Sequence, residues 1–154
     1  PALLPEEYLP DVHLRLVLYK RIAGASTDAD LDRLAAEITD RFGHLPEPTR
    51  NLLRITGLRL LARETGIAKL QAGATGGSVE FSPDTCIDPG RLVKLIENDP
   101  RRYRLDPRQR LVFRHDLGEA AKRLDYVEKL LKQLGRMRRV DEKAAATRHP
   151  TVAS

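Results

Sequence analysis

Residues 37–46 read EITDRFGHLP, and this stretch ends an amphipathic helix while placing charge on its outer face. Apolar side chains recur at the spacing that lines one side of that helix, at Leu31, Leu34, Ala35, Ile38 and Phe42. Gly43 follows directly, and glycine readily supplies the left-handed conformation in which many helices end. The pattern predicts a helix that begins near Ser26 or Thr27 and stops at Gly43.

The outer face of this predicted helix carries Glu37 and Asp40, opposite the apolar stripe. Two carboxylates three residues apart on an exposed face can contact a basic partner together. The alternative is a solvated face, because Arg33, Glu37 and Arg41 lie four residues apart and can pair within the helix. Composition alone favours the solvated face and leaves a docking surface as the competing hypothesis.

Two more helices are predicted in the N-terminal half of the chain. One spans residues 12–23, with Asp11 as its N-cap. Alternation at Val12, Leu14, Leu16 and Leu18 leaves a strand as the alternative for this segment. The other begins where Pro46 and Pro48 lie, because proline is favoured in the first turn of a helix, and it ends before Gly66. Three helices are therefore expected before the pattern changes.

After residue 66 the apolar pattern becomes short and extended. Two β-hairpins are predicted there, from residues 67–72 with 78–81 and from residues 102–105 with 110–114. The turn of the first hairpin, residues 73–77, is rich in glycine, which suits a turn that needs positive φ.

Two further helices accompany the hairpins. The first starts after Asp88, a good N-cap, and is closed by Pro100. The second opens with Asp116-x-x-Glu119, a capping-box pattern with Asp in place of Ser or Thr. We therefore expect five helices, one of them between the two hairpins.

This order of elements predicts an α+β fold. Three N-terminal helices are followed by two antiparallel hairpins that bracket a helix, and by a long C-terminal helix. We expect one domain over residues 1–139 and a disordered tail over residues 140–154, where no periodicity is visible.

Composition is that of an ordinary globular chain. Its 154 residues are 41% hydrophobic and 32% charged, which is enough for one domain with a real core. No apolar run approaches the ~20 residues of a membrane span. Cys86 is the single cysteine, so an internal disulfide is excluded, and a reducing cytoplasm is the expected location.

Charge is unevenly distributed along the chain. Residues 1–66 carry 9 Lys and Arg against 10 Asp and Glu, whereas residues 67–154 carry 18 against 12. The basic second half suggests an acidic partner or non-specific contact with nucleic acid.

The sequence contains no complete motif for catalysis or metal binding. The glycine-rich segment 73–78 lacks the Gly-Lys-Ser/Thr of a phosphate loop and leads into a strand. The histidines, at positions 13, 44, 115 and 149, have no metal-ligand spacing, and no histidine lies near Cys86 in sequence. We therefore predict no catalytic residue, no metal and no cofactor for this chain.

Four arginines form a competing candidate site on the second predicted hairpin. Because side chains alternate along a strand, the following residues should share one exposed face while the aromatic residues point to the core: Arg102, Arg104, Arg110 and Arg114. One hypothesis is phosphate binding, and the alternative is a set of solvated arginines over an apolar inner face. With the aromatics turned inward, base stacking of the kind that single-strand binders use is not expected. We predict weak or no DNA binding at physiological salt.

Four motifs occur in order along the chain: PEEYLPDV at 5–12, RLxLYKRI at 15–22, DRFGxLP at 40–46 and YRLD at 103–106. Together they resemble the C-terminal domain of the bacterial transcription-repair coupling factor, over about residues 4–139. The resemblance implies a non-catalytic regulatory domain at the end of a large ATP-driven DNA translocase. That translocase displaces stalled RNA polymerase and recruits nucleotide excision repair.

The resemblance also implies a partner within the same polypeptide. In that family this domain packs against an N-terminal module, which otherwise binds the damage-recognition ATPase of excision repair, and masks it until the translocase engages. Glu37, Asp40 and Arg41 fall where the family's docking helix is charged, and Arg33 lies one turn before Glu37. The resemblance thus favours intramolecular docking, with the repair ATPase and RNA polymerase as indirect partners.

Overall fold

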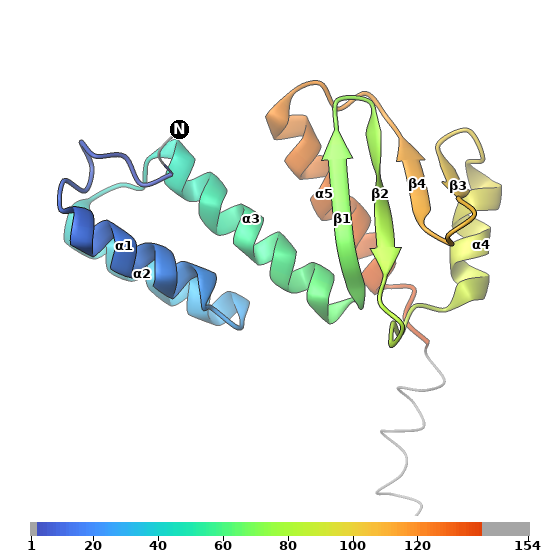
Figure 1. Cartoon of the computed structure of the whole chain (residues 1–154), viewed down its shortest axis with the longest axis horizontal. Coiled ribbons are helices and arrows are strands. Elements are labelled where there is room, and N and C mark those ends of the chain that lie inside the picture. The colour runs from blue at the N-terminus through green and yellow to red at the C-terminus, as the bar shows by residue number, and fades with distance from the viewer. Residues whose placement is uncertain (1–2, 140–154) are drawn as a thin grey trace, which may run out of the picture. The chain divides into compact units, whose positions relative to one another are not determined.

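The computed structural model describes residues 3–139, and its contacts divide the chain into two compact units, one up to Leu61 and one from Ala62 onward. Helices make up the first unit, whereas the strands belong to the second (Figure 1). A single domain over residues 1–139 stays a prediction, because two compact units can still unfold as one cooperative whole. The predicted tail, residues 140–154, lies outside the described residues.

The first unit contains the three predicted helices. They are α1 (Val12–Ala23), α2 (Asp28–Phe42) and α3 (Glu47–Glu64), the last of which continues past Leu61. The carboxylate of Asp11 caps α1 by accepting a hydrogen bond from the backbone N–H of Leu14. At the start of α2, Thr27 and Asp30 form a reciprocal capping box. Gly43 ends α2 where the sequence predicted and has a positive φ of 93°, but its ψ of −168° lies outside the left-handed helical conformation that was expected.

The core of the first unit is aliphatic. Its buried residues are Leu4, Leu9, Leu18, Ile22, Leu31, Leu34, Ile38 and Leu60. The segment before α1 is fixed by a hydrogen bond of 2.7 Å from the backbone N–H of Leu4 to the hydroxyl of Tyr19. The hydroxyl of Tyr8 donates to the carbonyl of Gly43 at 2.7 Å, and its ring meets Phe42 edge-on. The N-terminal segment is therefore fastened both to α1 and to the end of α2.

The second unit is a four-stranded antiparallel sheet with helices. In chain order it contains β1 (Ile67–Gly73), β2 (Gly76–Phe81), α4 (Pro89–Asn98), β3 (Tyr103–Leu105), β4 (Leu111–Arg114) and α5 (Ala120–Gly135). The two predicted hairpins join because β2 pairs with β4, which gives the strand order β1-β2-β4-β3 (Figure 1). The α+β class and the order of elements are confirmed.

Two glycines allow β2 to lie between its neighbours. A Cβ on Gly77 would approach the carbonyl oxygen of Gln71 to 1.9 Å, and one on Gly76 would approach the carbonyl oxygen of Phe113 to 2.1 Å. Gly76 also has a φ of 142°, which residues with a side chain rarely adopt. The glycine-rich turn predicted over residues 73–77 is thus shorter than expected, since Gly76 and Gly77 already belong to β2.

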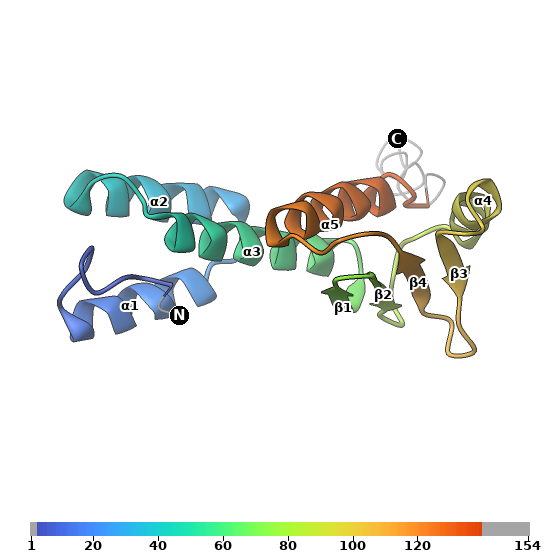
Figure 2. The same cartoon turned by 90° about the horizontal axis from the view of Figure 1, so that it is seen from above.

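The sheet has one covered and one open face in the second unit. Figure 2 shows α4 and α5 on the same side of the strands. The buried residues on that side include Val79, Leu111, Phe113 and Tyr103 of the strands, and Leu92, Leu95, Val127, Leu130, Leu131 and Leu134 of the helices. Gln71, Ser78, Val112 and Arg104 form a row of paired residues across the strands on the opposite face.

The capping box predicted at residues 116–119 is wrong. The helix begins only at Ala120, and its N-cap residue Glu119 makes no side-chain cap hydrogen bond. The segment before it is held elsewhere, because the backbone N–H of Leu117 donates to the carbonyl of Ala74 at 2.7 Å and the Leu117 side chain is buried. Hydrogen bonding to the β1–β2 turn therefore keeps this segment out of the helix.

Candidate functional site

The outer face of α2 presents small and charged side chains. A shallow open depression on α2 is lined by Ala36, Glu37, Thr39 and Asp40, together with Ala35 from the edge of the apolar stripe. Arg33, Asp40 and Arg41 are exposed, and Glu37 is partly covered. All four residues that the sequence proposed for protein contact therefore lie on this helix and reach solvent.

Glu37 is held by the neighbouring helix. Its carboxylate accepts a hydrogen bond from, and forms an ion pair with, the guanidinium of Arg21 on α1. This hydrogen bond is the main reason why the pKa of Glu37 lies below its ordinary value, and the charges of Arg21 and Arg41 act in the same direction. Arg33 pairs with Asp30 rather than with Glu37. The sequence allowed Glu37 to pair with Arg33 or Arg41 within α2. In the structure it pairs with Arg21 of α1 instead.

Asp40 differs from Glu37 in its availability. It is exposed, and within residues 3–139 no cation forms an ion pair with it. The guanidinium of the next residue, Arg41, lies 5.0 Å from the centre of the Phe42 ring instead. Asp40 is therefore an exposed carboxylate without an ion pair among the described residues, and Glu37, three residues before it, is held by Arg21.

The second unit contains the candidate phosphate site. A hollow of about 470 Å³ brings together three of the four predicted arginines, Arg102, Arg104 and Arg114. Arg101 also lines it, although strand alternation counted from residue 102 did not include that residue. The adjacent arginine pair at 101–102 was the signal available in the sequence. We call this feature, with its four lining arginines, the arginine hollow.

Arg110 does not belong to the arginine hollow. Its Nε donates to the carboxylate of Asp106 at 2.7 Å, and the side chain of Asp106 is only 9% exposed. The same carboxylate accepts the backbone N–H groups of Arg108 and Arg110, and the latter bond is the main cause of its lowered pKa. Arg110 therefore stabilises the β3–β4 turn. Strand pairing ends at Leu105 and Leu111, so alternation no longer fixes the direction of residue 110.

A tyrosine pair lies beneath the arginine hollow. The hydroxyls of Tyr103 and Tyr126 are 3.0 Å apart, and His115 stacks on the Tyr126 ring at 4.8 Å between centroids. Burial is the main reason why the pKa of Tyr126 is raised. The cluster joins β3 to α5, and no local pattern in the sequence indicates it.

Metal centres and membrane helices are absent from the part of the chain that the structure describes. Within residues 3–139, no group of three or more His, Cys, Asp or Glu side chains is placed to hold a metal ion. In the same residues, no helix is both long and apolar enough to cross a membrane.

Three helices followed by a helix-covered antiparallel sheet define the class of this protein as an α+β domain with charged outer faces. The chain belongs to the TRCF domain family, whose model matches residues 1–92. The resemblance found from its sequence motifs is thereby confirmed.

Relatives and one solved structure support the assignment. The chain is 45% identical to a transcription-repair-coupling factor of Haemophilus influenzae and 42% identical to one of Escherichia coli, over 87% of this chain in both cases. It spans 12% of the length of these curated relatives. A crystal structure of the C-terminal domain of transcription-repair coupling factor matches with a TM-score of 0.71, covering 87% of this chain and 86% of that chain. At 17% identity this structural match shows the fold.

Proposed function

We propose that this chain is a non-catalytic regulatory domain of a transcription-repair coupling factor, and that α2 docks on an N-terminal module of the same polypeptide. The observation that carries the proposal is the exposed Asp40 beside the fixed carboxylate of Glu37. Over its whole length α2 carries five Asp and Glu against two Arg. A basic surface on the partner is the complement of such a helix.

The geometry of α2 suits close contact with a partner. Ala35, Ala36 and Thr39 are small, so a partner backbone can approach α2 closely beside Asp40. Arg21 already holds Glu37, so less side-chain freedom is lost when that residue enters an interface. Glu37 is ionised at neutral pH, and its lowered pKa extends the ionised state to more acidic pH.

Docking within one polypeptide explains how a modest surface can regulate. A linked module is present at an effective concentration far above that of a free competitor, so even a weak contact can keep it covered. In this proposal the covered module is the one that binds the damage-recognition ATPase of excision repair. ATP-driven translocation on DNA and displacement of stalled RNA polymerase belong to the proposed parent protein, not to this chain.

Charge reversal on α2 tests the proposal. We expect Glu37→Lys/Asp40→Lys to weaken binding of this chain to the separate N-terminal module by about a hundredfold, because each lost carboxylate leaves a partner cation without its counter-charge. Isothermal titration calorimetry measures the affinity. In the parent protein, the same change should permit binding of the repair ATPase without prior engagement of DNA or polymerase.

A matched control has the same change in net charge. Glu6→Lys/Glu7→Lys reverses two exposed carboxylates of the first unit that lie outside α2. Equal loss of binding in both double variants would show that net charge, and not the face of α2, causes the effect. Unchanged binding in the α2 variant would refute docking through this face, and a large fall in its melting temperature would show that the two residues act in folding.

A further inference from the structure

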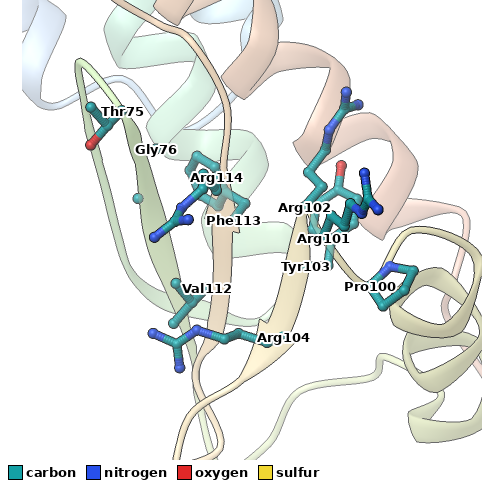
Figure 3. Close-up of a pocket in the computed structure, with 11 residues that line it drawn as sticks. Thr75, Gly76, Pro100, Arg101, Arg102, Tyr103, Arg104, Val112, Phe113 and Arg114 are labelled. Carbon is teal, nitrogen blue, oxygen red and sulfur yellow. The ribbon is translucent and has the colours of Figure 1, made fainter.

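The arginine hollow presents its cations in two pairs that point in different directions. Figure 3 shows Arg104 and Arg114 extending past Val112 on the same side of the sheet, whereas Arg101 and Arg102 extend from the start of β3 beside Tyr103. The register agrees with this view, because Arg104 pairs with Val112 and Arg114 lies two residues further along β4. The four cations are therefore spread over β3, the segment before it and the end of β4 rather than gathered around one point.

Most of this positive charge has no partner within the chain. Arg102 lies 3.4 Å from the carboxylate of Asp99. Among the described residues, Arg101, Arg104 and Arg114 make no ion pair. Like charges on neighbouring strands disfavour the fold, so an external anion that neutralises them is stabilising.

The one carboxylate among the strand residues does not neutralise them. Glu80 lies on β2, which β4 separates from β3, and it pairs in register with Lys69 of β1. The side of the open face formed by β4 and β3 is therefore purely cationic.

From this arrangement we propose that the arginine hollow binds the phosphate backbone of double-stranded DNA without reading its sequence. Guanidinium groups match phosphate oxygens in two parallel hydrogen bonds. Because the two arginine pairs diverge, a single phosphate cannot contact all four side chains, but a polymer with regularly spaced phosphates can. A polyanion fits the geometry better than a free phosphate ion.

The surroundings of the hollow favour duplex DNA over a single strand or an acidic protein. Proteins that bind single strands stack bases on aromatic side chains, whereas Tyr103 and Phe113 are buried on the covered face of the sheet. Protein interfaces have apolar or aromatic anchors at their centres. Tyr103 and Phe113 line this hollow but are buried in the chain's own core, which leaves Val112 and Pro100 as its accessible apolar side chains. A polar and strongly basic surface is typical of contact with the DNA backbone.

This DNA contact is independent of the proposed docking of α2. The arginine hollow is made by residues of the second unit, and the docking face by residues of the first. Failure of either proposal leaves the other standing. A contact with few phosphates is weak by itself, so we expect measurable binding of this chain only at low salt.

Fluorescence anisotropy with a labelled duplex of about 20 base pairs tests the proposal. The full chain is compared with Arg101→Ala/Arg104→Ala/Arg114→Ala between about 25 and 200 mM salt. We expect the triple variant to lose at least about tenfold in affinity at the lowest salt. The slope of log affinity against log salt should become shallower by about two to three, roughly one for each lost phosphate contact.

The control variant Lys94→Ala/Lys122→Ala/Lys129→Ala removes the same charge from exposed positions on α4 and α5. It should bind the duplex almost as well as the unaltered chain. Equal losses in the two triple variants, or no binding to the duplex at the lowest salt, would overturn the proposal.

Two competitors identify the ligand class. A single strand of equal length that binds as tightly as the duplex, or polyglutamate that competes as well as DNA at equal charge, would also overturn the proposal. Circular dichroism checks the fold of each variant. If the triple variant is unfolded, Arg104→Ala alone should still reduce the salt slope by about one.

Discussion

The two compact units use charge in opposite ways. Residues up to Leu61 carry 8 Lys and Arg against 9 Asp and Glu, whereas the rest carry 19 against 13. In the first unit Arg21 and Arg33 are paired with carboxylates. In the second, Arg102 and Arg110 are also paired, but Arg104 and Arg114 face solvent from neighbouring strands without an ion pair among the described residues. A nearly neutral unit can thus offer carboxylates to a basic partner, while a basic unit offers arginines to an anion.

The units also differ in the range of the interactions that build them. The first two helices of the first unit have caps within a few residues of their starts, at Asp11 and in the Thr27–Asp30 box. The sheet of the second unit depends on pairing of residues 76–79 with residues 111–114, far apart in sequence. Steric fit across that pairing should therefore matter more to stability than any single local signal in the helices.

The largest expected effect comes from a side chain placed at the centre of the sheet. Gly77→Val should destabilise the protein by about 4 kcal/mol or more, because the new Cβ meets the carbonyl oxygen of Gln71 at 1.9 Å and the Phe113 ring at 2.7 Å. Urea denaturation measures the loss. Gly73→Ala is the control, since its Cβ has no atom nearer than 3.9 Å.

Hydrogen exchange of the Gly77→Val variant tests whether the two units fold together. If residues 1–139 form one domain, amides of α1 and α2 should lose protection together with those of the sheet. Helices that keep their protection while the sheet opens would show two independently folding units. An unchanged denaturation midpoint would contradict the close approach of β2 to its neighbours.

A smaller effect is expected from the capping box of α2. Thr27→Ala should cost about 1 kcal/mol, because the backbone N–H of Asp30 loses its hydrogen bond to the Thr27 hydroxyl. Faster exchange should be confined to the first turn of α2. Ser26→Ala is a suitable control, because Ser26 contributes only its backbone N–H to this cap. Equal destabilisation by both variants would argue against the box as the source of stability.

The smallest effect concerns Glu37 in acid. Its pKa in the folded state lies below the ordinary value of 4.5, so the Arg21 contact contributes stability above that pH and loses it as the pH falls through the folded value. The melting temperature of Glu37→Gln should therefore fall less steeply between about pH 5 and 3 than that of the unaltered chain. The difference should be small, because the two side chains are 45% and 41% exposed. Parallel curves would show that Arg21 and Glu37 do not pair in solution.

Local patterns predicted most elements of the fold. The apolar stripe of α2, its stop at Gly43 and the caps at Asp11 and Asp88 each depend on residues within a few helical turns. Predictions of this kind do not depend on how distant parts of the chain fold. The α+β class followed because helical and alternating patterns occupy separate parts of the sequence.

Two predictions from local patterns were wrong: the helix cap at residues 116–119 and the place of Arg110 among the exposed arginines. A long-range contact explains the first, and a contact within a turn explains the second. The motif at 116–119 resembles a cap, but hydrogen bonding of Leu117 to Ala74 keeps it out of the helix. Alternation grouped Arg110 with the other arginines, but Asp106 draws it into the turn. In each case a contact outside the predicted element determined the conformation.

Residue identity and near neighbours were sufficient to predict the order and type of the elements, the charge of each half of the chain and the family to which it belongs. Three features emerged only from the folded chain: the joining of the two hairpins into one sheet, the contact of Arg21 with Glu37, and the presence of Arg101 rather than Arg110 in the arginine hollow. The physical reason is the same for all three. Each depends on the direction of a backbone or side chain relative to another segment, which local spacing does not specify.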